Sequence, residues 1–380
     1  MLCEDMVEPK CKHFGSCGGC RFQHLPYNLQ LEQKEEQLRT LFPAYRLEPI
    51  LGCEEEWRWR NKMEFSFSQA KCGERFLGLM MRGKRGRVIT LKECYLTDTW
   101  FVDALQKVYQ WWEGDDLEAY FPPANRGHLR TLTFRHGIQS GEKMAMLTIS
   151  GELTQEQEEG FVACLPDFHS LILRTQMTQK GVPTRFEEKV LQGRGYIFET
   201  LGDFCFKIRG SSFFQPNTLQ AERLYQKIFE LANFQKDEIL LDLYCGTGTI
   251  GIWCAHAVKR VVGVELNKEA ILDAQENISL NEISNMEVLE GDVEKIFEML
   301  PFPDVVIVDP PRAGLSAKTV KELLLQGAKK IIYVSCNPRS QAQDIAQLEE
   351  RYIVEGLFPV DQFPQTPHVE NIAMLSLKVI

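Results

Sequence analysis

The sequence has no long hydrophobic segment, because no apolar run in its 380 residues approaches the roughly 18 residues that span a membrane. Residues 1–5 lack the basic stretch that opens a secretory signal peptide. An excess of positive charge is also missing, since the formal net charge is −10. We therefore expect a cytoplasmic protein with no membrane partner and no indiscriminate binding of nucleic acid. A local basic groove is compatible with this charge.

The composition is that of a globular protein, with 44% hydrophobic residues, and the length predicts two or three domains. The chain contains 12 cysteines. In a reducing compartment these are not expected to form disulfides. Clustered cysteines then indicate a metal site, and isolated ones indicate packing or catalysis.

Three cysteines, Cys11, Cys17 and Cys20, lie within ten residues of one another, and the glycines between them allow a tight fold around one centre. A metal centre needs a fourth thiolate, for which the candidates are Cys53, Cys72 and Cys94. We favour Cys94, because the strand-like segment 87–91 could carry it back towards the cluster. Zinc and a 4Fe-4S cluster both fit four cysteines, and three clustered cysteines plus a distant one favour iron and sulfur.

The first half of the chain is predicted to be rich in β-strands. Segment 57–67 interleaves basic and aromatic residues with strand-like alternation, and 82–87 is a second basic patch. Segments 128–135 and 143–149 are two more alternating strands. Basic side chains suit phosphates and flat rings suit unstacked bases, so this composition indicates RNA binding. An ordinary edge strand followed by a basic hairpin tip would give the same pattern.

The pattern changes near residue 201. Before that point, segment 25–41 predicts an exposed helix with solvated charges and no chemical role. After it, Asn217 is a plausible N-cap of an amphipathic helix, and strands and helices then alternate to the C-terminus. This alternation predicts an α/β doubly wound sheet. We place an RNA-recognition region at 1–200 and a second domain at 201–380.

A glycine-rich turn follows a strand near residue 243 and contains Gly246, Gly248 and Gly251 in the spacing G-x-G-x-x-G. The next strand ends at Glu265, about 20 residues after the first glycine, where a carboxylate can bind ribose hydroxyls. A dinucleotide and S-adenosylmethionine (SAM) both satisfy this pattern. The motif alone therefore does not distinguish hydride transfer from methyl transfer.

Two later strands end in residues suited to chemistry. Asp309 follows the strand 304–308 and precedes two prolines, which form a stiff loop where a substrate base can be held. The strand 330–335 ends at Cys336 and the turn-favouring pair Asn-Pro. Ligands bind outside the carboxyl ends of such strands, so Cys336 is a candidate nucleophile. Glu370 lies in a polar loop before the last strand.

These motifs occur in an order that resembles the RNA (uracil-5-)methyltransferase family, from the three-cysteine cluster through SSFFQPN, DLYCGTG, VVGVE, VDPPRAGL, YVSCNP and HVENIAML. The resemblance covers nearly the whole chain. It is greatest to the iron-sulfur members that act on 23S ribosomal RNA, since the bacterial transfer-RNA enzymes of the family lack the cysteine cluster. We expect the N-terminal β-barrel of some relatives to be absent.

The resemblance implies a C-terminal Rossmann-like SAM methyltransferase domain and a β-rich RNA-recognition domain that carries a 4Fe-4S cluster. It implies that Cys336 is the nucleophile and Glu370 the base. The implied cofactor and active-site contacts are Gln215, Tyr244, Glu265 and Asp309. The implied cluster ligands are Cys11, Cys17, Cys20 and Cys94. Tyr244 stands where relatives often have phenylalanine.

The implied function is SAM-dependent methylation of C5 of one uridine in 23S rRNA, through a covalent adduct of Cys336 with C6, to give 5-methyluridine. We expect a monomer whose partner is RNA. Methylation of uridine 54 in tRNA is a second candidate function. A non-catalytic RNA-binding or ribosome-assembly factor is a third, and a NAD-linked oxidoreductase is a more remote fourth.

Overall fold

The computed structural model describes residues 6–84, 86–179 and 181–379, and the chain forms two compact units. Unit 1 consists mainly of Glu55–Thr200, with the segment up to Pro26 and the short stretch Ile208–Ser211. Unit 2 consists of Tyr27–Glu54, Leu201–Lys207 and Ser212–Ile380. Segment 27–54 was predicted to belong to the first region, whereas the structure groups it with unit 2.

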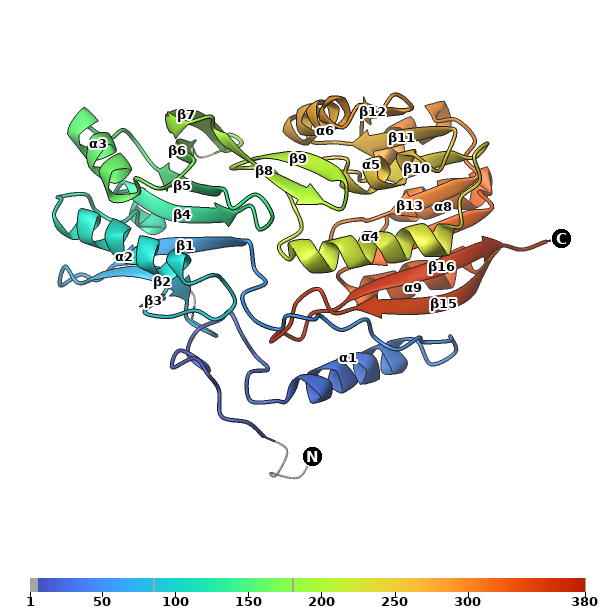
Figure 1. Cartoon of the computed structure of the whole chain (residues 1–380), viewed down its shortest axis with the longest axis horizontal. Helices are drawn as coiled ribbons and strands as arrows, with labels where there is room; N and C mark the ends of the chain where they lie inside the picture. The colour runs from blue at the N-terminus through green and yellow to red at the C-terminus, as the bar shows by residue number, and fades with distance from the viewer. Residues whose placement is uncertain (1–5, 85, 180, 380) are drawn as a thin grey trace. The chain divides into compact units, whose positions relative to one another are not determined.

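Unit 1 is built on a seven-stranded sheet with the strand order β3-β2-β1-β4-β5-β6-β7 (Figure 1). Its strands are β1 (Lys62–Gln69), β2 (Arg75–Met80), β3 (Val88–Thr90), β4 (Leu129–His136), β5 (Lys143–Ile149), β6 (Ser170–Met177) and β7 (Arg185–Gly193). Neighbouring strands are antiparallel except β5 and β6, which are parallel. A parallel pair needs a crossover, and α3 (Gln155–Cys164) lies in that connection.

The core of unit 1 lies between this sheet and its helices. The helix α2 (Trp100–Glu113) has its apolar side buried, and Trp112 and Phe101 pack with strand residues such as Phe134. A short 3-10 helix, η2 (Pro122–Ala124), precedes β4. The β-rich first half is therefore confirmed. The strand predicted within 57–67 is shorter at its start than expected. It begins at Lys62, and residues 57–61 form no strand.

Unit 2 contains a seven-stranded sheet with the order β12-β11-β10-β13-β14-β16-β15 (Figure 1). The strands are β10 (Ile239–Leu243), β11 (Arg260–Glu265), β12 (Met286–Glu290), β13 (Val305–Val308), β14 (Lys330–Ser335), β15 (Tyr352–Val360) and β16 (Glu370–Leu377). The first five are parallel, and β16 is antiparallel to both β14 and β15.

A separate two-stranded sheet pairs β8 (Tyr196–Leu201) with β9 (Phe204–Arg209).

Helices cover the unit 2 sheet, whose central strands are buried throughout, as expected for a doubly wound sheet. The helices are α1 (Tyr27–Leu41), α4 (Thr218–Ala232), α5 (Thr249–Ala255), α6 (Lys268–Leu280), α7 (Val293–Ile296), α8 (Ala317–Gln326) and α9 (Pro338–Leu348), with the 3-10 helix η3 (Phe297–Met299). Alternate strand residues such as Val306 and Val308 join Leu323 of α8 and Ile345 of α9 in one core cluster. The predicted alternation of strands and helices is confirmed.

The first helix differs from its prediction. It spans Tyr27–Leu41, as expected for 25–41, but it is not an exposed helix with solvated charges. Gln30, Lys34 and Leu38 are buried and follow one another at intervals of four residues, which places them on one face. Lys34 is 1% exposed because it forms an ion pair inside unit 2.

The predicted N-cap Asn217 is confirmed, whereas Glu370 lies in a strand and not in the predicted loop. Asn217 caps α4, and its side chain accepts the backbone N–H of Gln220. Glu370, predicted in a loop, is instead the first residue of β16 and is buried. Within the described residues, every helix is too short or too polar to cross a membrane.

Candidate functional site

The glycine-rich turn follows β10 where the strand order of the unit 2 sheet reverses. From β10 the chain proceeds to β11 and β12 on one side and then returns to β13 on the other. Ligands of doubly wound sheets bind at such a switch point. Gly248 has a φ of +80°, and a Cβ atom at Gly251 would lie 2.5 Å from Cε of Met286. The positive φ of Gly248 favours glycine there, whereas a side chain at Gly251 would displace the flexible end of Met286 and lie 2.9 Å from Oδ2 of Asp242.

Glu265, the last residue of β11, supports this turn. Its Oε2 atom accepts the backbone N–H of Gly246 at 3.0 Å. Its Oε1 atom accepts those of Leu266 and Asn267, each at 2.8 Å. A carboxylate oxygen has two lone pairs, so Oε2 can also accept a hydrogen bond from a ribose hydroxyl. The geometry is compatible with the predicted role of Glu265.

Two further predicted contacts, Gln215 and Tyr244, lie on loops of the same unit. Gln215 is buried in the loop before α4. The hydroxyl of Thr247 donates to the carbonyl of Phe213 at 3.4 Å and so ties that loop to the glycine-rich turn. Tyr244 follows β10 with a φ of +63°, and its hydroxyl lies 3.5 Å from that of Thr319. Both residues therefore belong to the loops around the switch point.

Cys336 and Glu370 lie at the same end of the β14–β16 pair. In this antiparallel pair Ser335 lies opposite Asn371. Cys336 directly follows Ser335 and Glu370 directly precedes Asn371, so the two residues lie at the same end of the strand pair. Cys336 is half-buried and Glu370 is buried. The structure thus brings together the predicted nucleophile and base.

The loop after β13 brings a second carboxylate, Asp309, and a cation, Arg312, to this pair. Asn337 Nδ2 donates to the Arg312 carbonyl at 2.7 Å, and Ser340 Oγ donates to it at 3.3 Å. Both donors belong to the N-terminal end of α9, directly after Cys336. The loop is therefore anchored beside the thiol.

Burial and the two carboxylates control the protonation of this site. Burial raises the pKa of Cys336 to about 11, Glu370 and Asp309 add to the increase, and Arg312 opposes it. Burial also raises the pKa of Asp309 to about 7. Burial, with a contribution from Asp309, holds the pKa of Glu370 well above its ordinary value. The thiol is therefore protonated at neutral pH, and Glu370 is a stronger base than a solvated carboxylate.

Four cysteines line one cavity in unit 1, and they are Cys11, Cys17, Cys20 and Cys94. Apolar side chains such as those of Leu79 and Leu91 also line it, together with the polar side chains of His13, Gln23 and Glu93. Burial raises the pKa of the first three thiols, to about 12 for Cys20, and neighbouring thiols add to the increase. A nearby cation would remove this penalty on the thiolates.

Neither of the remaining candidates for the fourth thiolate lines this cavity. Cys53 belongs to unit 2, where its Sγ atom lies 3.5 Å from Asn217 Nδ2. Cys72 is exposed in the turn between β1 and β2. In the ranges 6–84, 86–179 and 181–379, no group of three or more His, Cys, Asp or Glu side chains has the arrangement of a metal site. The four thiols thus share a cavity without forming a coordination geometry.

The basic and aromatic segment 57–61 runs beside the residues after Cys94. The backbone N–H groups of Arg58 and Arg60 donate to the carbonyls of Tyr95 and Leu96, each at 2.8 Å. The predicted RNA-contacting stretch therefore lies next to the cysteine cavity within unit 1.

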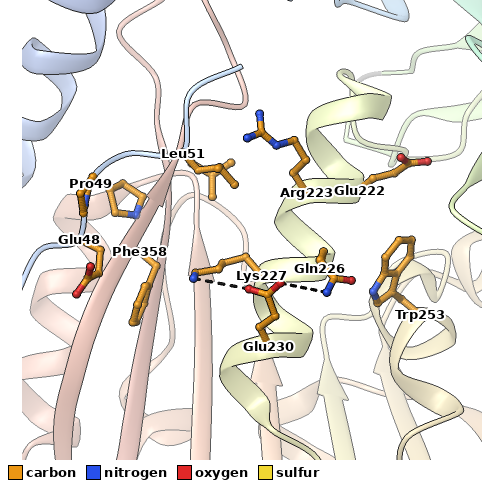
Figure 2. Close-up of a pocket in the computed structure, with 12 residues that line it drawn as sticks. Glu48, Pro49, Leu51, Glu222, Arg223, Gln226, Lys227, Glu230, Trp253 and Phe358 are labelled. Atoms are coloured by element: carbon orange, nitrogen blue, oxygen red, sulfur yellow. Dashed lines mark hydrogen bonds and ion pairs between the residues drawn. The ribbon is translucent and has the colours of Figure 1, made fainter. Parts of the chain in front are cut away.

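A groove of about 590 Å³ in unit 2 has a different character (Figure 2). It lies between α4 and β15, and none of the predicted site residues lines it. Lys227 Nζ is 3.8 Å from a carboxylate oxygen of Glu230 and 5.2 Å from the centre of the Phe358 ring. Three glutamates accompany one lysine and one arginine in the lining. This excess of carboxylates is unsuited to phosphate groups.

The comparison with protein families decides the class of this site. The pattern of the tRNA (uracil-5-)methyltransferase family matches residues 26–378. The chain belongs to this family. It is 44% identical over 409 residues to an uncharacterized RNA methyltransferase of Protochlamydia amoebophila, covering 99% of this chain and 92% of that protein. It is 33% identical over 388 residues to one of Staphylococcus aureus, covering 99% and 85%.

A solved structure of the family has the same fold. The Pyrococcus abyssi tRNA (uracil-54, C5)-methyltransferase, in complex with S-adenosyl-L-homocysteine, is 29% identical and has a TM-score of 0.78. The similarity covers 95% of this chain and 86% of that one. The predicted SAM-dependent RNA methyltransferase is thereby confirmed. The family match begins after Cys20, so it carries no information about the three-cysteine cluster.

Arg312 and Asn337 also belong to the candidate site of this chain, but they were not predicted from the sequence. Arg312 lies within the VDPPRAGL motif, in which the sequence indicated a role for Asp309 alone. Asn337 was interpreted only as half of a turn-forming pair, although its side chain holds the Arg312 carbonyl. A cation three residues after Asp309 was the available signal for Arg312.

The opposed charges around Cys336 predict opposite effects on its reactivity. Alkylation by iodoacetamide should rise with pH through a midpoint of about 11, because the thiolate reacts. Glu370→Gln removes a negative charge and should move the midpoint to lower pH, whereas Arg312→Gln removes a positive charge and should move it higher. Mass spectrometry of the Cys336 peptide measures the rate, with the exposed Cys72 as internal reference. Shifts of the same sign in both variants would contradict this electrostatic assignment.

Proposed function

We propose that the protein methylates C5 of one uridine in 23S rRNA through a covalent adduct between Cys336 and C6. The observation that carries this proposal is the β14–β16 pairing, which brings a thiol and a buried carboxylate to the same end of two neighbouring strands. Acid–base chemistry on a covalently held base needs this pair on one face of the site. Family membership supports the reaction class, and the cysteine cluster supports the choice of 23S rRNA.

Activation of the thiol is the first step. Because burial keeps Cys336 protonated, the thiol has to lose its proton to solvent before it attacks, and Glu370 is kept for the later C5 proton. The thiolate then adds to C6 of uracil, and the electron pair of the C5–C6 double bond moves into an enolate. Arg312 is the cation that favours negative charge at this thiol.

Release of the product reverses the addition. SAM, when bound, supplies the methyl group that C5 acquires from the sulfonium. Glu370 then accepts the C5 proton, the C5–C6 double bond re-forms, and Cys336 leaves as a thiolate. A stacked base shields C6, so the target uridine has to be unpaired or flipped out.

The residues around the switch point fit SAM. Glu265 can accept a ribose hydroxyl, and the glycine-rich turn leaves room for a close approach of the ligand to the backbone. We assign Gln215, Tyr244 and Asp309 to the same site, because they lie on the neighbouring loops. Asp309 is half-buried at the end of β13, where it can contact the methyl donor or the target base.

Methylation of uridine 54 in tRNA is the second candidate. The Pyrococcus abyssi neighbour acts on this position and shares the fold over nearly the whole chain. The target RNA is therefore the part of the proposal to test first.

Incubation with tritiated SAM and total RNA from cells that lack the gene should label 23S rRNA at one 5-methyluridine. The RNA is separated by size, and the labelled nucleoside is identified and mapped. Cys336→Ala should give no label, because neither the adduct nor the activated C5 forms. Label confined to tRNA would overturn the 23S assignment and favour the second candidate.

Removal of the base should stop the reaction after methyl transfer. Glu370→Gln is expected to slow turnover by about 10²–10⁴-fold and to accumulate methylated RNA bound to Cys336, since the C5 proton cannot leave. A SAM-dependent slow band on a denaturing gel reports this species, and the double variant with Cys336→Ala should lack it. Normal turnover of Glu370→Gln would show that another group is the base.

We further propose that Cys11, Cys17, Cys20 and Cys94 hold a 4Fe-4S cluster. All four thiols line one cavity, and burial raises the pKa of the first three, so that without a cation these are protonated. Soft thiolates in this number suit iron and sulfur. All four are used as ligands, so a structural role is expected. When bound, the cluster would tie the N-terminal segment to the chain that follows β3.

Anaerobically purified protein should be brown and contain iron and acid-labile sulfide. Cys17→Ser should lower the iron content and reduce folding or RNA binding more than SAM binding, because Cys17 lies in unit 1 and the SAM residues lie in unit 2. Metal analysis, a melting curve and a SAM titration measure the three effects. Stoichiometric zinc without iron would overturn the assignment.

A further inference from the structure

The loop between β15 and Glu370 is buried, although loops normally run over the surface. Of residues 361–369, six are buried and only His368 is exposed. Buried backbone and polar side chains need hydrogen-bond partners. Several of these partners come from α1, more than 300 residues earlier in the sequence.

Lys34 of α1 binds this loop at two points. Its Nζ atom lies 2.5 Å from Asp361 Oδ1 and 3.1 Å from the Phe363 carbonyl. The side chains of Lys34 and Asp361 are 1% and 0% exposed. Asp361 Oδ1 also accepts the backbone N–H of Phe363 at 3.2 Å. The ammonium group thus fixes the turn that begins the loop.

Two more residues of α1 bind the same loop. The Tyr27 hydroxyl donates to Asp361 Oδ2 at 2.8 Å and accepts the backbone N–H of Cys53 at 2.6 Å. Gln30 is paired with Gln365 twice, through its Nε2 atom at 3.1 Å and through its Oε1 atom at 2.9 Å. Gln365 has a φ of +66°, a conformation that such contacts can maintain.

The loop is also joined to the segment that contains Gln215. Asn217 Nδ2 donates to the Gln362 carbonyl at 3.3 Å, and Gln362 Nε2 donates to the Asn217 carbonyl at 3.1 Å. One buried network therefore links α1, the start of α4 and the residues that lead into Glu370.

We infer that Tyr27, Gln30 and Lys34 are positioning residues, which hold the loop 361–369 so that Glu370 meets the C5 proton. This inference rests on the proposed role of Glu370 as the base. The hydrogen bonds described above join the three side chains to the loop and to Cys53, and they reach Glu370 only through the loop. Their loss should therefore affect the late proton transfer more than the earlier methyl transfer.

Tyr27→Phe and Lys34→Met test this inference, with Tyr352→Phe as a matched control. Tyr352 is a fully buried tyrosine of the same unit, and its hydroxyl donates to the Ala328 carbonyl at 3.0 Å, away from the loop. Tyr27→Phe and Tyr352→Phe remove one hydroxyl each. Melting curves show which variants are folded, and Tyr27→Phe decides the outcome if Lys34→Met does not fold.

Two rates are measured in each variant. Single-turnover transfer of tritiated methyl to RNA reports the early step, and the decay of the SAM-dependent covalent band reports the late step. We expect Tyr27→Phe and Lys34→Met to slow the decay by about 10–100-fold, since small displacements of a catalytic group have effects of this size. Methyl transfer should stay within about threefold of the wild type, and Tyr352→Phe should change neither rate.

Two results would overturn the inference. In one, both rates fall together in Tyr27→Phe, which indicates a general structural role. In the other, neither rate differs from that of Tyr352→Phe. Glu370→Gln in the same assay separates the inference from the proposed function. If it traps the adduct while Tyr27→Phe and Lys34→Met do not, positioning fails and the function stands. If Glu370→Gln traps nothing, the base assignment itself fails.

Discussion

The antiparallel pairing of β14 with β16 is the constraint on which the candidate active site depends. Parallel strands bring only their carboxyl ends to the ligand-binding edge of a sheet, and β13 and β14 deliver Asp309 and Cys336 in this way. Because β16 runs in the opposite direction, its first residue meets the end of β14. Side chains alternate along a strand, so a register shift of one residue would turn the side chain of Glu370 to the other face of the sheet. The buried apolar residues that follow in β16 resist such a shift, because it would remove them from their packing partners.

Burial sets the electrostatic character of the site. The Asp242 carboxylate accepts the backbone N–H of Gly251 in the glycine-rich turn. Burial raises the pKa of Asp242 to about 7, and it also raises the pKa values of Asp309 and Glu370. Burial and mutual repulsion make it unfavourable to ionise these carboxyl groups at the same time. A cationic ligand stabilises their ionised forms, so the site favours such a ligand. The sulfonium of SAM carries such a charge. The features that keep the thiol protonated in the free protein therefore also suit the methyl donor.

Local pattern in the sequence was enough to predict part of the fold and of the site. The apolar run before Cys336 and the glycine spacing after β10 follow from neighbouring residues, and the strand-like segment 87–91 favoured Cys94 among three candidates for the fourth thiolate. Features that depend on distant partners could not be found in this way. Lys34 lies on a charged helix and was predicted to be solvated, because its partner Asp361 is far away in the sequence. Glu370 was placed in a loop, since a buried acid at the start of a strand has no local signature. Arg312 acts on Cys336 through its charge, and its place three residues after Asp309 was a signal that did not reveal this effect on the thiol.

The buried pair of Lys34 and Asp361 is not explained by stability alone. Replacement of such a pair by apolar residues is often neutral or stabilising, whereas loss of one partner costs about 3–5 kcal/mol. An apolar pair would fill the same space but would bind neither the Phe363 carbonyl nor the Tyr27 hydroxyl in a fixed direction. Hydrogen bonds fix the orientation of the loop. Because this loop leads into the proposed base, a fixed orientation is more important than additional apolar burial. Leu38, one turn further along α1, contributes to the apolar core of unit 2. A single helix face thus provides both apolar packing and the polar contacts that orient the loop before Glu370.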